Sequence, residues 1–172
     1  VGRLALARPD VAFTLLHPHN LVLNTPGKGN LLETVAAVLG SNTARKMIPV
    51  SYEDKQMRLS GYISSPDLVR SSMNAVTFLV NGRVIRSQLL NQALKEGYYT
   101  SIHAGTYPLA VLSFTMSPAD YDVNVHPAKL DIKFKDEKGL AARIAQIIRE
   151  AILADKPFRS VPSGGLYAQA PT

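Results

Sequence analysis

The segment from Asp122 to Phe134 constrains the fold more than any other part of this 172-residue chain. Asp122, Asn124 and His126 alternate with valines, which predicts a strand with one polar and one apolar face. Pro127 has a fixed φ and no backbone N–H, so a central strand is not expected to run through it. The segment is therefore predicted to fold as a strand, a sharp turn and a second strand.

The second half of this segment alternates again. Leu130, Ile132 and Phe134 are predicted to lie on the buried face, and the charged residues between them on the other face. Lys129 is placed at the turn, where a lysine can reach a neighbouring site as a point charge, which suits a phosphate. On pattern alone, a hairpin that ends in a solvated lysine is the simpler interpretation.

The composition is that of an ordinary globular domain with a basic balance. Hydrophobic residues make up 46% of the chain and charged residues 19%, and the net charge is +6. A basic balance favours polyanionic partners, with nucleic acid first among them. Cysteine is absent, which excludes disulfides and thiolate metal sites and permits a reducing compartment. No apolar run approaches the roughly 20 residues that a membrane span requires.

The remaining patterns predict strands alternating with helices. Strands are expected at residues 11–17, 21–24, 47–52, 57–64, 75–80 and 107–116, and helices at 31–39, 88–96 and 138–153. Asn30 is the expected N-cap of the first helix, and Gly97 the expected end of the second. About seven strands and three helices in this order indicate an α+β fold with helices packed on a mixed sheet.

Both ends of the chain differ from this pattern. Leu4 and Ala7 are typical of the last turn of a helix that begins upstream, which indicates a piece excised from a longer protein. Residues from Asp155 onward are rich in proline and glycine, which is typical of a linker or a disordered tail. The predicted organisation is therefore one domain over residues 1–154 and a tail over residues 155–172.

Two other motifs do not predict a functional site. The glycine-rich loop around Lys28 lacks the Gly-Lys-Ser/Thr spacing of a phosphate-binding loop. His17 and His19 are two residues apart, but no third ligand is evident near them, so turn histidines are the better interpretation. No metal site is predicted.

Two blocks of sequence resemble a known family. The run Asn-Val-His-Pro-Ala-Lys at residues 124–129, followed by an acidic–aliphatic–basic–Phe run, resembles the signature of the MutL family of DNA mismatch-repair ATPases. Phe78–Arg83 resembles that family's Phe/Tyr-Val-Asn-Gly-Arg segment. The likeness runs from about residue 1 to residue 153. It implies a ribosomal-protein-like transducer domain with a left-handed β-α-β crossover, following a GHKL-type ATPase domain.

The resemblance also implies roles for residues of the signature. Lys129 would be the catalytic lysine that reaches the γ-phosphate of ATP, and Lys129 and Asn124 would form this domain's part of the ATP site. ATP and Mg²⁺ are expected as cofactors of the full-length protein, and neither is expected on this fragment, which should be inactive alone. Asp131 and Lys133 depart mildly from the commoner Glu and Arg of the family, and Lys133 lacks the bidentate fork of Arg.

The resemblance further implies partners. We expect sequence-independent, salt-dependent DNA binding through phosphate contacts. The candidate DNA-binding residues are Arg83, Arg86, Lys95, Lys133 and Lys135. The full-length protein is expected to form a homodimer, to act with the mismatch-recognition protein MutS and to reside in the bacterial cytoplasm, with no membrane partner.

Two alternatives remain open at this stage. The chain could be a stand-alone nucleic-acid-binding α+β module, in which Lys129 is an ordinary phosphate contact. It could also be a small hydrolase that uses His126 and Asp122, which the alternation places on one face of a strand.

Overall fold

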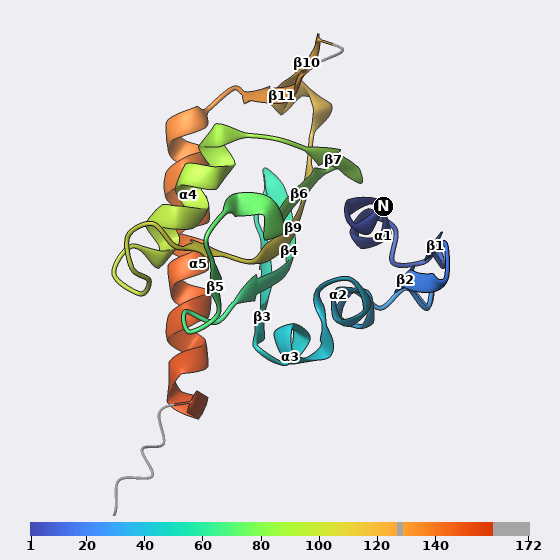
Figure 1. Ribbon diagram of the computed structural model, residues 1–172. Coiled ribbons are helices and arrows are strands. Elements are labelled where there is room, and N and C mark those ends of the chain that lie inside the picture. The colour runs from blue at the N-terminus through green and yellow to red at the C-terminus, as the bar shows by residue number, and fades with distance from the viewer. Residues whose placement is uncertain (127–128, 160–172) are drawn as a thin grey trace, which may run out of the picture.

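The computed structural model describes the backbone of residues 1–126 and 129–159, and the side chains of residues 1–122 and 132–155. Within these ranges the chain forms three layers, with a central sheet between two groups of helices (Figure 1). The predicted α+β fold with helices packed on a mixed sheet is confirmed. The α-helices are α1 (Gly2–Ala7), α2 (Leu31–Leu39), α3 (Ser41–Arg45), α4 (Gln88–Tyr98) and α5 (Glu137–Arg159).

The central sheet has five strands in the order β3-β4-β9-β6-β7. Its strands are β3 (Met47–Glu53), β4 (Met57–Ser64), β6 (Val76–Val80), β7 (Arg83–Ile85) and β9 (Ala110–Met116). β6 and β9 are parallel, and the other neighbouring pairs are antiparallel. The chain passes from β6 to β9 through β7 and α4, which confirms the predicted β-α-β unit. The left hand of this crossover stays a prediction from the resemblance.

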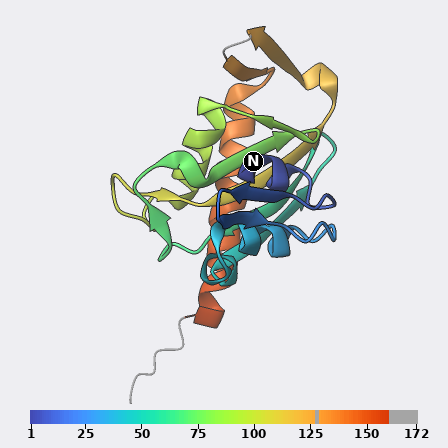
Figure 2. The same cartoon turned by 45° about the vertical axis from the view of Figure 1, so that its right-hand side comes forward.

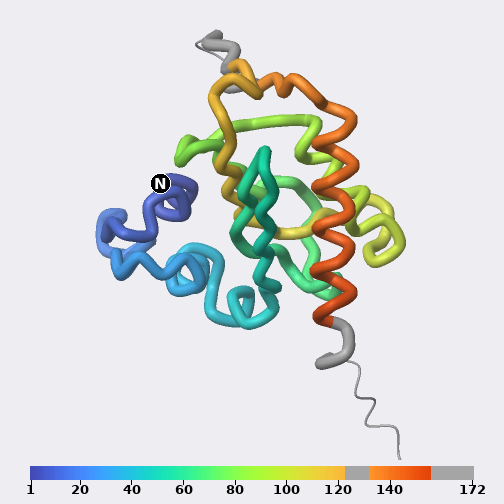
Figure 3. Tube along the Cα trace, turned by 180° about the vertical axis from the view of Figure 1, so that it is seen from behind, coloured from blue at the N-terminus to red at the C-terminus, as the bar shows by residue number. Residues whose placement is uncertain are grey.

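Each face of the sheet has its own hydrophobic core. The larger core lies between the sheet and the pair α4 and α5, and it includes Phe114, Leu59 and Tyr98, all fully buried. The smaller core joins Leu6 of α1 and Val35 of α2 to the opposite face. The view from behind shows α5 on one side of the sheet and the N-terminal helices on the other (Figure 3). The sheet is therefore buried on both faces, which fits the burial of all five residues of β6.

The predicted strand over residues 107–116 is divided in two. β8 (Tyr107–Pro108) pairs with β5 (Val69–Arg70), a short strand that was not predicted. A 3₁₀ turn, η1 (Met73–Ala75), follows β5. The division falls at Leu109, whose N–H donates to Ser64 Oγ (2.9 Å) and whose carbonyl accepts from Ser64 N (2.8 Å). These bonds hold the start of β9 against the end of β4.

Two helix predictions needed correction, and one helix was missed. Gly97 does not end α4, because it lies inside the last turn, buried against α5. The short helix α3 was not predicted. α5 continues to Arg159, so residues 155–159 belong to the helix and not to a tail, and residues 160–172 lie outside the described part of the chain. The predicted cap at Asn30 is confirmed, because its Oδ1 accepts from Glu33 N at 3.2 Å.

Two hairpins stand apart from the central sheet. The first joins β1 (Thr14–His17) to β2 (Asn20–Asn24). The second joins β10 (Tyr121–His126) to β11 (Lys129–Phe134) and follows a 3₁₀ turn, η2 (Pro118–Asp120). The β10–β11 hairpin lies at one end of the molecule, beyond the edge of the sheet (Figure 2). This confirms the two predicted strands, while the predicted turn at residues 127–128 lies outside the described part of the chain.

Candidate functional site

The β10–β11 hairpin places the signature segment away from the body of the domain. Tyr121 pairs with Phe134 at its root, and His126 pairs with Lys129 at its outer end. Asn124 lies opposite Asp131 in the same ladder. The side chains of Lys129, Asn124 and His126 are outside the described side chains. Their predicted roles, including the His126 of the hydrolase alternative, therefore stay predictions, although the backbone puts Lys129 near the far end of a projecting arm.

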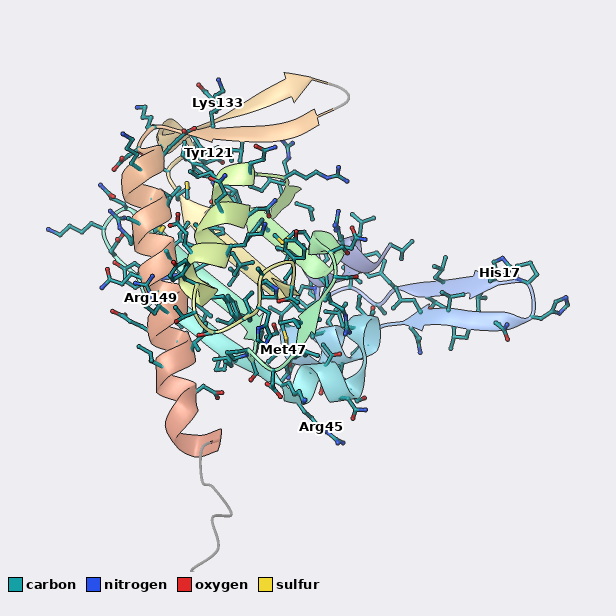
Figure 4. The ribbon with its side chains drawn as sticks, turned by 60° about the vertical axis from the view of Figure 1, so that its left-hand side comes forward. His17, Arg45, Met47, Tyr121, Lys133 and Arg149 are labelled. Carbon is teal, nitrogen blue, oxygen red and sulfur yellow. The ribbon has the colours of Figure 1, made fainter. Side chains whose placement is uncertain are left out.

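The root of the hairpin is anchored in the larger core. Ile132 and Phe134 are each 7% exposed and pack among the core side chains, as the alternation predicted. Lys133, between them in sequence, is exposed and points away from the core (Figure 4). Lys135 N donates to Asp120 O at 3.0 Å, which extends the strand pairing by one bond past the root. The hairpin is therefore fixed to the core at its base by β11.

The second signature block forms the turn between β6 and β7, beside the hairpin root. Asn81 and Gly82 have φ values of 49° and 81°, which asparagine and glycine adopt more readily than other residues. The side chain of Asn81 donates to the hydroxyl of Tyr121, the first residue of β10. β7 in turn contacts β11. The fold thus brings the block at Phe78–Arg83 beside the root of the hairpin that carries the other block.

A hollow opens between the hairpin root and the start of α5. Phe134, Lys135 and Arg143 are among the residues that line it. Arg143 donates to Asp54 Oδ2 and to Gln56 Oε1, each at 3.0 Å, so its charge is already matched by an acidic partner. Hydrogen bonds from backbone N–H groups, that of Met57 first, hold the pKa of Asp54 below its ordinary value. The hollow therefore adjoins the hairpin root, and the arginine that lines it is paired within the domain.

The five candidate DNA-binding residues do not all gather in one place. Arg83 lies exposed on β7, and Lys133 lies exposed on β11, the strand that β7 contacts. Lys135 follows at the hairpin root. Lys95, in contrast, lies in the last turn of α4, with its ammonium nitrogen 4.4 Å from the centre of the Tyr107 ring in β8. The structure therefore groups Arg83, Lys133 and Lys135, and places Lys95 against another part of the domain.

Arg86 faces a second hollow, which sequence reasoning did not anticipate. Arg3 of α1 lines the same hollow and donates to Asn74 O at 3.4 Å. Ser87 also lines it, and its Oγ caps α4 by accepting from Leu90 N. No local pattern could have linked Arg3 to Arg86, because only the packing of α1 beside β7 brings them to one site.

Two kinds of site are absent from the described residues. They contain no group of three or more histidine, cysteine, aspartate or glutamate side chains that could hold a metal ion. In the same part of the chain, no helix combines the length and the apolar character needed to span a bilayer.

Comparison with known proteins relates this chain to DNA mismatch repair. Residues 35–153 match the family described as "DNA mismatch repair protein, C-terminal domain". The protein named DNA mismatch repair protein MutL from Geobacillus kaustophilus is 45% identical over 151 residues, which cover 88% of this chain and 24% of that protein. The protein of the same name from Listeria monocytogenes is 42% identical over 151 residues, 88% of this chain and 25% of that protein.

The fold has a relative among solved structures. A crystal structure of the N-terminal domain of a DNA repair protein superimposes with a TM-score of 0.75 at 20% identity, over 91% of this chain and 52% of that one. At that identity the likeness concerns the fold alone. The chain spans about a quarter of the length of its MutL relatives. Since the family match extends over most of the chain and includes both signature blocks, the chain belongs to the MutL family of DNA mismatch-repair proteins.

Proposed function

We propose that this domain acts in DNA mismatch repair by coupling ATP binding and hydrolysis elsewhere in the full-length protein to dimerisation and DNA binding. In this role Lys129 reaches the γ-phosphate of an ATP molecule held, with Mg²⁺, by another domain, and Asn124 supports the same site. The observation that carries the proposal is the β10–β11 hairpin, which positions the backbone of Lys129 at the outer end of a strand pair rooted in the core.

The geometry of the hairpin suits a contact made across a domain boundary. Five residue steps separate Tyr121 at the root from His126, the partner of Lys129, which corresponds to roughly 17 Å of strand. Phosphoryl transfer depends mainly on positioning and on charge stabilisation, so a lysine delivered from outside can assist the reaction. The contact between Lys129 and the γ-phosphate also makes the position of this domain depend on whether the γ-phosphate is present.

The test is ATP hydrolysis by the full-length protein in the absence of DNA. Lys129→Ala should lower kcat by roughly tenfold or more, equivalent to about 1.4 kcal/mol of barrier. Lys133→Ala is the matched control, because it removes a lysine from the exposed face of the same strand and should leave the rate unchanged. An unaltered rate in Lys129→Ala would refute the role of this lysine.

DNA binding is the second part of the proposal. Its support is the net charge of +6 and the exposed group of Arg83, Lys133 and Lys135 beside the hairpin root. Contacts to phosphates make affinity fall steeply with salt and carry little sequence preference. Arg83→Ala should weaken binding to unrelated duplexes alike and reduce the salt slope by about one. Arg58→Ala is the control, because Arg58 is exposed but pairs with Glu53 at 2.9 Å.

The same assays distinguish this proposal from the alternative of a stand-alone nucleic-acid-binding module. If the domain only binds nucleic acid, Lys129→Ala lowers DNA affinity and its salt slope while ATP hydrolysis stays intact. Action with MutS, a homodimer of the full-length protein and a cytoplasmic location belong to the proposal as well. Sedimentation of the full-length protein, alone and mixed with MutS, with and without ATP, tests the homodimer and the action with MutS.

A further inference from the structure

The side chain of Asn81 forms a clamp across the root of the β10–β11 hairpin. Its Nδ2 donates to Met116 O at 2.9 Å and to the Tyr121 hydroxyl at 2.7 Å. Its Oδ1 accepts from Met116 N at 3.1 Å. The orientation of the amide follows from chemistry, because a backbone N–H can meet only the oxygen and a backbone carbonyl only the NH₂ group.

The side chain of Asn81 continues the hydrogen bonding of the sheet beyond the point where the backbone pairing of β6 with β9 ends. β6 pairs with β9 as far as Val80 opposite Phe114, and Asn81 N then donates to Phe114 O at 2.8 Å. Beyond that point the chain turns into β7, and the Asn81 amide supplies the next donor and acceptor to Met116. The last residue of β9 is thereby held in the sheet just before the chain enters η2 and the hairpin. A third bond, to Tyr121, fixes the start of β10 to the same side chain.

We propose that Asn81 is a positioning residue for Lys129, because its clamp sets the angle at which the hairpin leaves the domain. This inference rests on the proposed role of Lys129. A tilt of about 10° at the root, over roughly 17 Å of strand, moves the outer end by about 3 Å. That displacement equals the length of a hydrogen bond, so it would separate a lysine from a phosphate oxygen.

Few residues can replace Asn81 in this position. The backbone φ of 49° is strained for most side chains, whereas asparagine and glycine tolerate it. Asparagine alone of these two has a donor and an acceptor on one planar group. Asn81→Gly is therefore the informative variant, because it keeps the turn and removes all three side-chain hydrogen bonds.

The experiment measures kcat for ATP hydrolysis and ATP affinity in the full-length protein without DNA. Asn81→Gly should lower kcat by roughly tenfold, since small misplacements of a catalytic group cost rates of this order or more. ATP affinity should change less than twofold. In a Lys129→Ala background, Asn81→Gly should have no further effect on kcat, because a positioning residue acts only through the group that it positions.

A milder variant and a control keep the test decisive if Asn81→Gly folds poorly. Tyr121→Phe removes only the hydroxyl that Nδ2 contacts and should lower kcat in the same Lys129-dependent way, by a smaller factor. Tyr99→Phe removes a hydroxyl from a tyrosine that is 79% exposed and should change nothing. Thermal unfolding of each variant gives the folded fraction to which kcat is normalised.

The outcomes distinguish a failure of the positioning role of Asn81 from a failure of the proposed function. An unchanged kcat per folded molecule in Asn81→Gly or Tyr121→Phe, with Lys129→Ala impaired, overturns the positioning role alone. Multiplicative losses in the double variant do the same, because Asn81 would then act by another route. A normal rate in Lys129→Ala overturns the proposed function and the inference with it.

Discussion

Gly97 tests how tightly the two long helices must pack. It lies in the last turn of α4, and a Cβ added there would stand 2.5 Å from both Cβ and Cγ2 of Ile148 and 3.1 Å from Ala145 O. Carbon atoms in contact prefer about 3.5–4.0 Å, so α4 and α5 would have to separate locally by about 1 Å. Ile148 is fully buried and branched at Cβ, and its Cβ cannot be moved by rotation about χ1.

The magnitude follows from two opposing effects. Alanine is favoured over glycine inside a helix by about 1 kcal/mol. Overpacking of a well-filled core costs about 1–3 kcal/mol, and the upper end applies here because the nearest atoms belong to a stiff side chain. Gly97→Ala should therefore lower the free energy of unfolding by about 2 kcal/mol, which corresponds to about 4–8 °C in Tm for a domain of this size.

The assay is urea unfolding followed by circular dichroism. Gln92→Ala is the control, because Gln92 is exposed on the same helix and its replacement should change the stability by less than about 0.5 kcal/mol. In an Ile148→Ala background the loss caused by Gly97→Ala should shrink by at least about 0.5 kcal/mol. Equal or greater stability of Gly97→Ala would show that the contact between the helices yields without cost, and the argument would fail.

Three further substitutions probe the sheet and its turns. Tyr98→Phe removes the buried hydroxyl that donates to Ser64 O, which should cost about 1–2 kcal/mol of unfolding free energy, and a Tm equal to wild type would contradict this. Gly61→Ala, at φ 144°, would bring its Cβ to 1.9 Å from a backbone oxygen of β9, so a loss of about 3 kcal/mol or more is expected by the same assay. A hydrogen bond from the Met57 N–H is the main reason why the pKa of Asp54 in the folded state lies below its ordinary value of 3.8. The contribution of this carboxylate to the free energy of unfolding is therefore complete at neutral pH and is lost as the pH falls below about 4. Asp54→Ala should therefore cost about 1–2 kcal/mol at pH 7 and much less at pH 3, and a difference independent of pH would exclude this linkage.

The parts of the fold that sequence reasoning predicted are those fixed by local chemistry. The period of two around Ile132 and Phe134 placed both side chains in the core. Asn30 caps α2 as its side chain predicts, because a short polar side chain before an apolar run satisfies the first free N–H groups. Such signals lie within a few residues of one another, so no tertiary information is needed to find them.

The errors arose where a residue serves a distant contact. Gly97 has the appearance of a helix end, but it is glycine because α5 passes too close for a Cβ. Leu109 interrupts an otherwise continuous strand pattern because its backbone bonds to Ser64, 45 residues away. The position of Lys95 also depends on a tertiary contact, because its ammonium group lies over the Tyr107 ring, and its predicted DNA contact stays a prediction. In each case the deciding partner lies far along the chain, where no local pattern records it.

The candidate site shows the same limit. The signature predicted that Lys129 would sit beside a turn, and the ladder confirms that it pairs with His126 at the outer end of the hairpin. The sequence could not show that the Asn81-Gly82 turn, some 40 residues earlier, supports the root of that hairpin through Tyr121. Two motifs read separately in the sequence are one unit in the structure.

The β1–β2 hairpin differs from β10–β11 in having no such anchor. Leu16, Leu21 and Val22 are 71%, 59% and 58% exposed, and none of them joins either hydrophobic core (Figure 4 shows His17 at the far end of this hairpin). A small sheet with open edges and uncovered apolar side chains is a template for association between molecules.

This 172-residue chain should therefore self-associate at high concentration through β1–β2. Leu16→Lys with Val22→Lys should lower the weight-average mass measured by analytical ultracentrifugation, with the stability changed by no more than about 0.5 kcal/mol. Leu153→Lys alters a leucine of α5 that is 53% exposed and is the matched control, expected to leave the mass distribution unchanged. If the control reduced association as much as the hairpin variant, general charge would be the cause. A lower mass in the hairpin variant, with no change in Leu153→Lys, would show that the molecules associate through the β1–β2 hairpin. The cause would then be that this hairpin is not packed on a core, and not exposed apolar area in general.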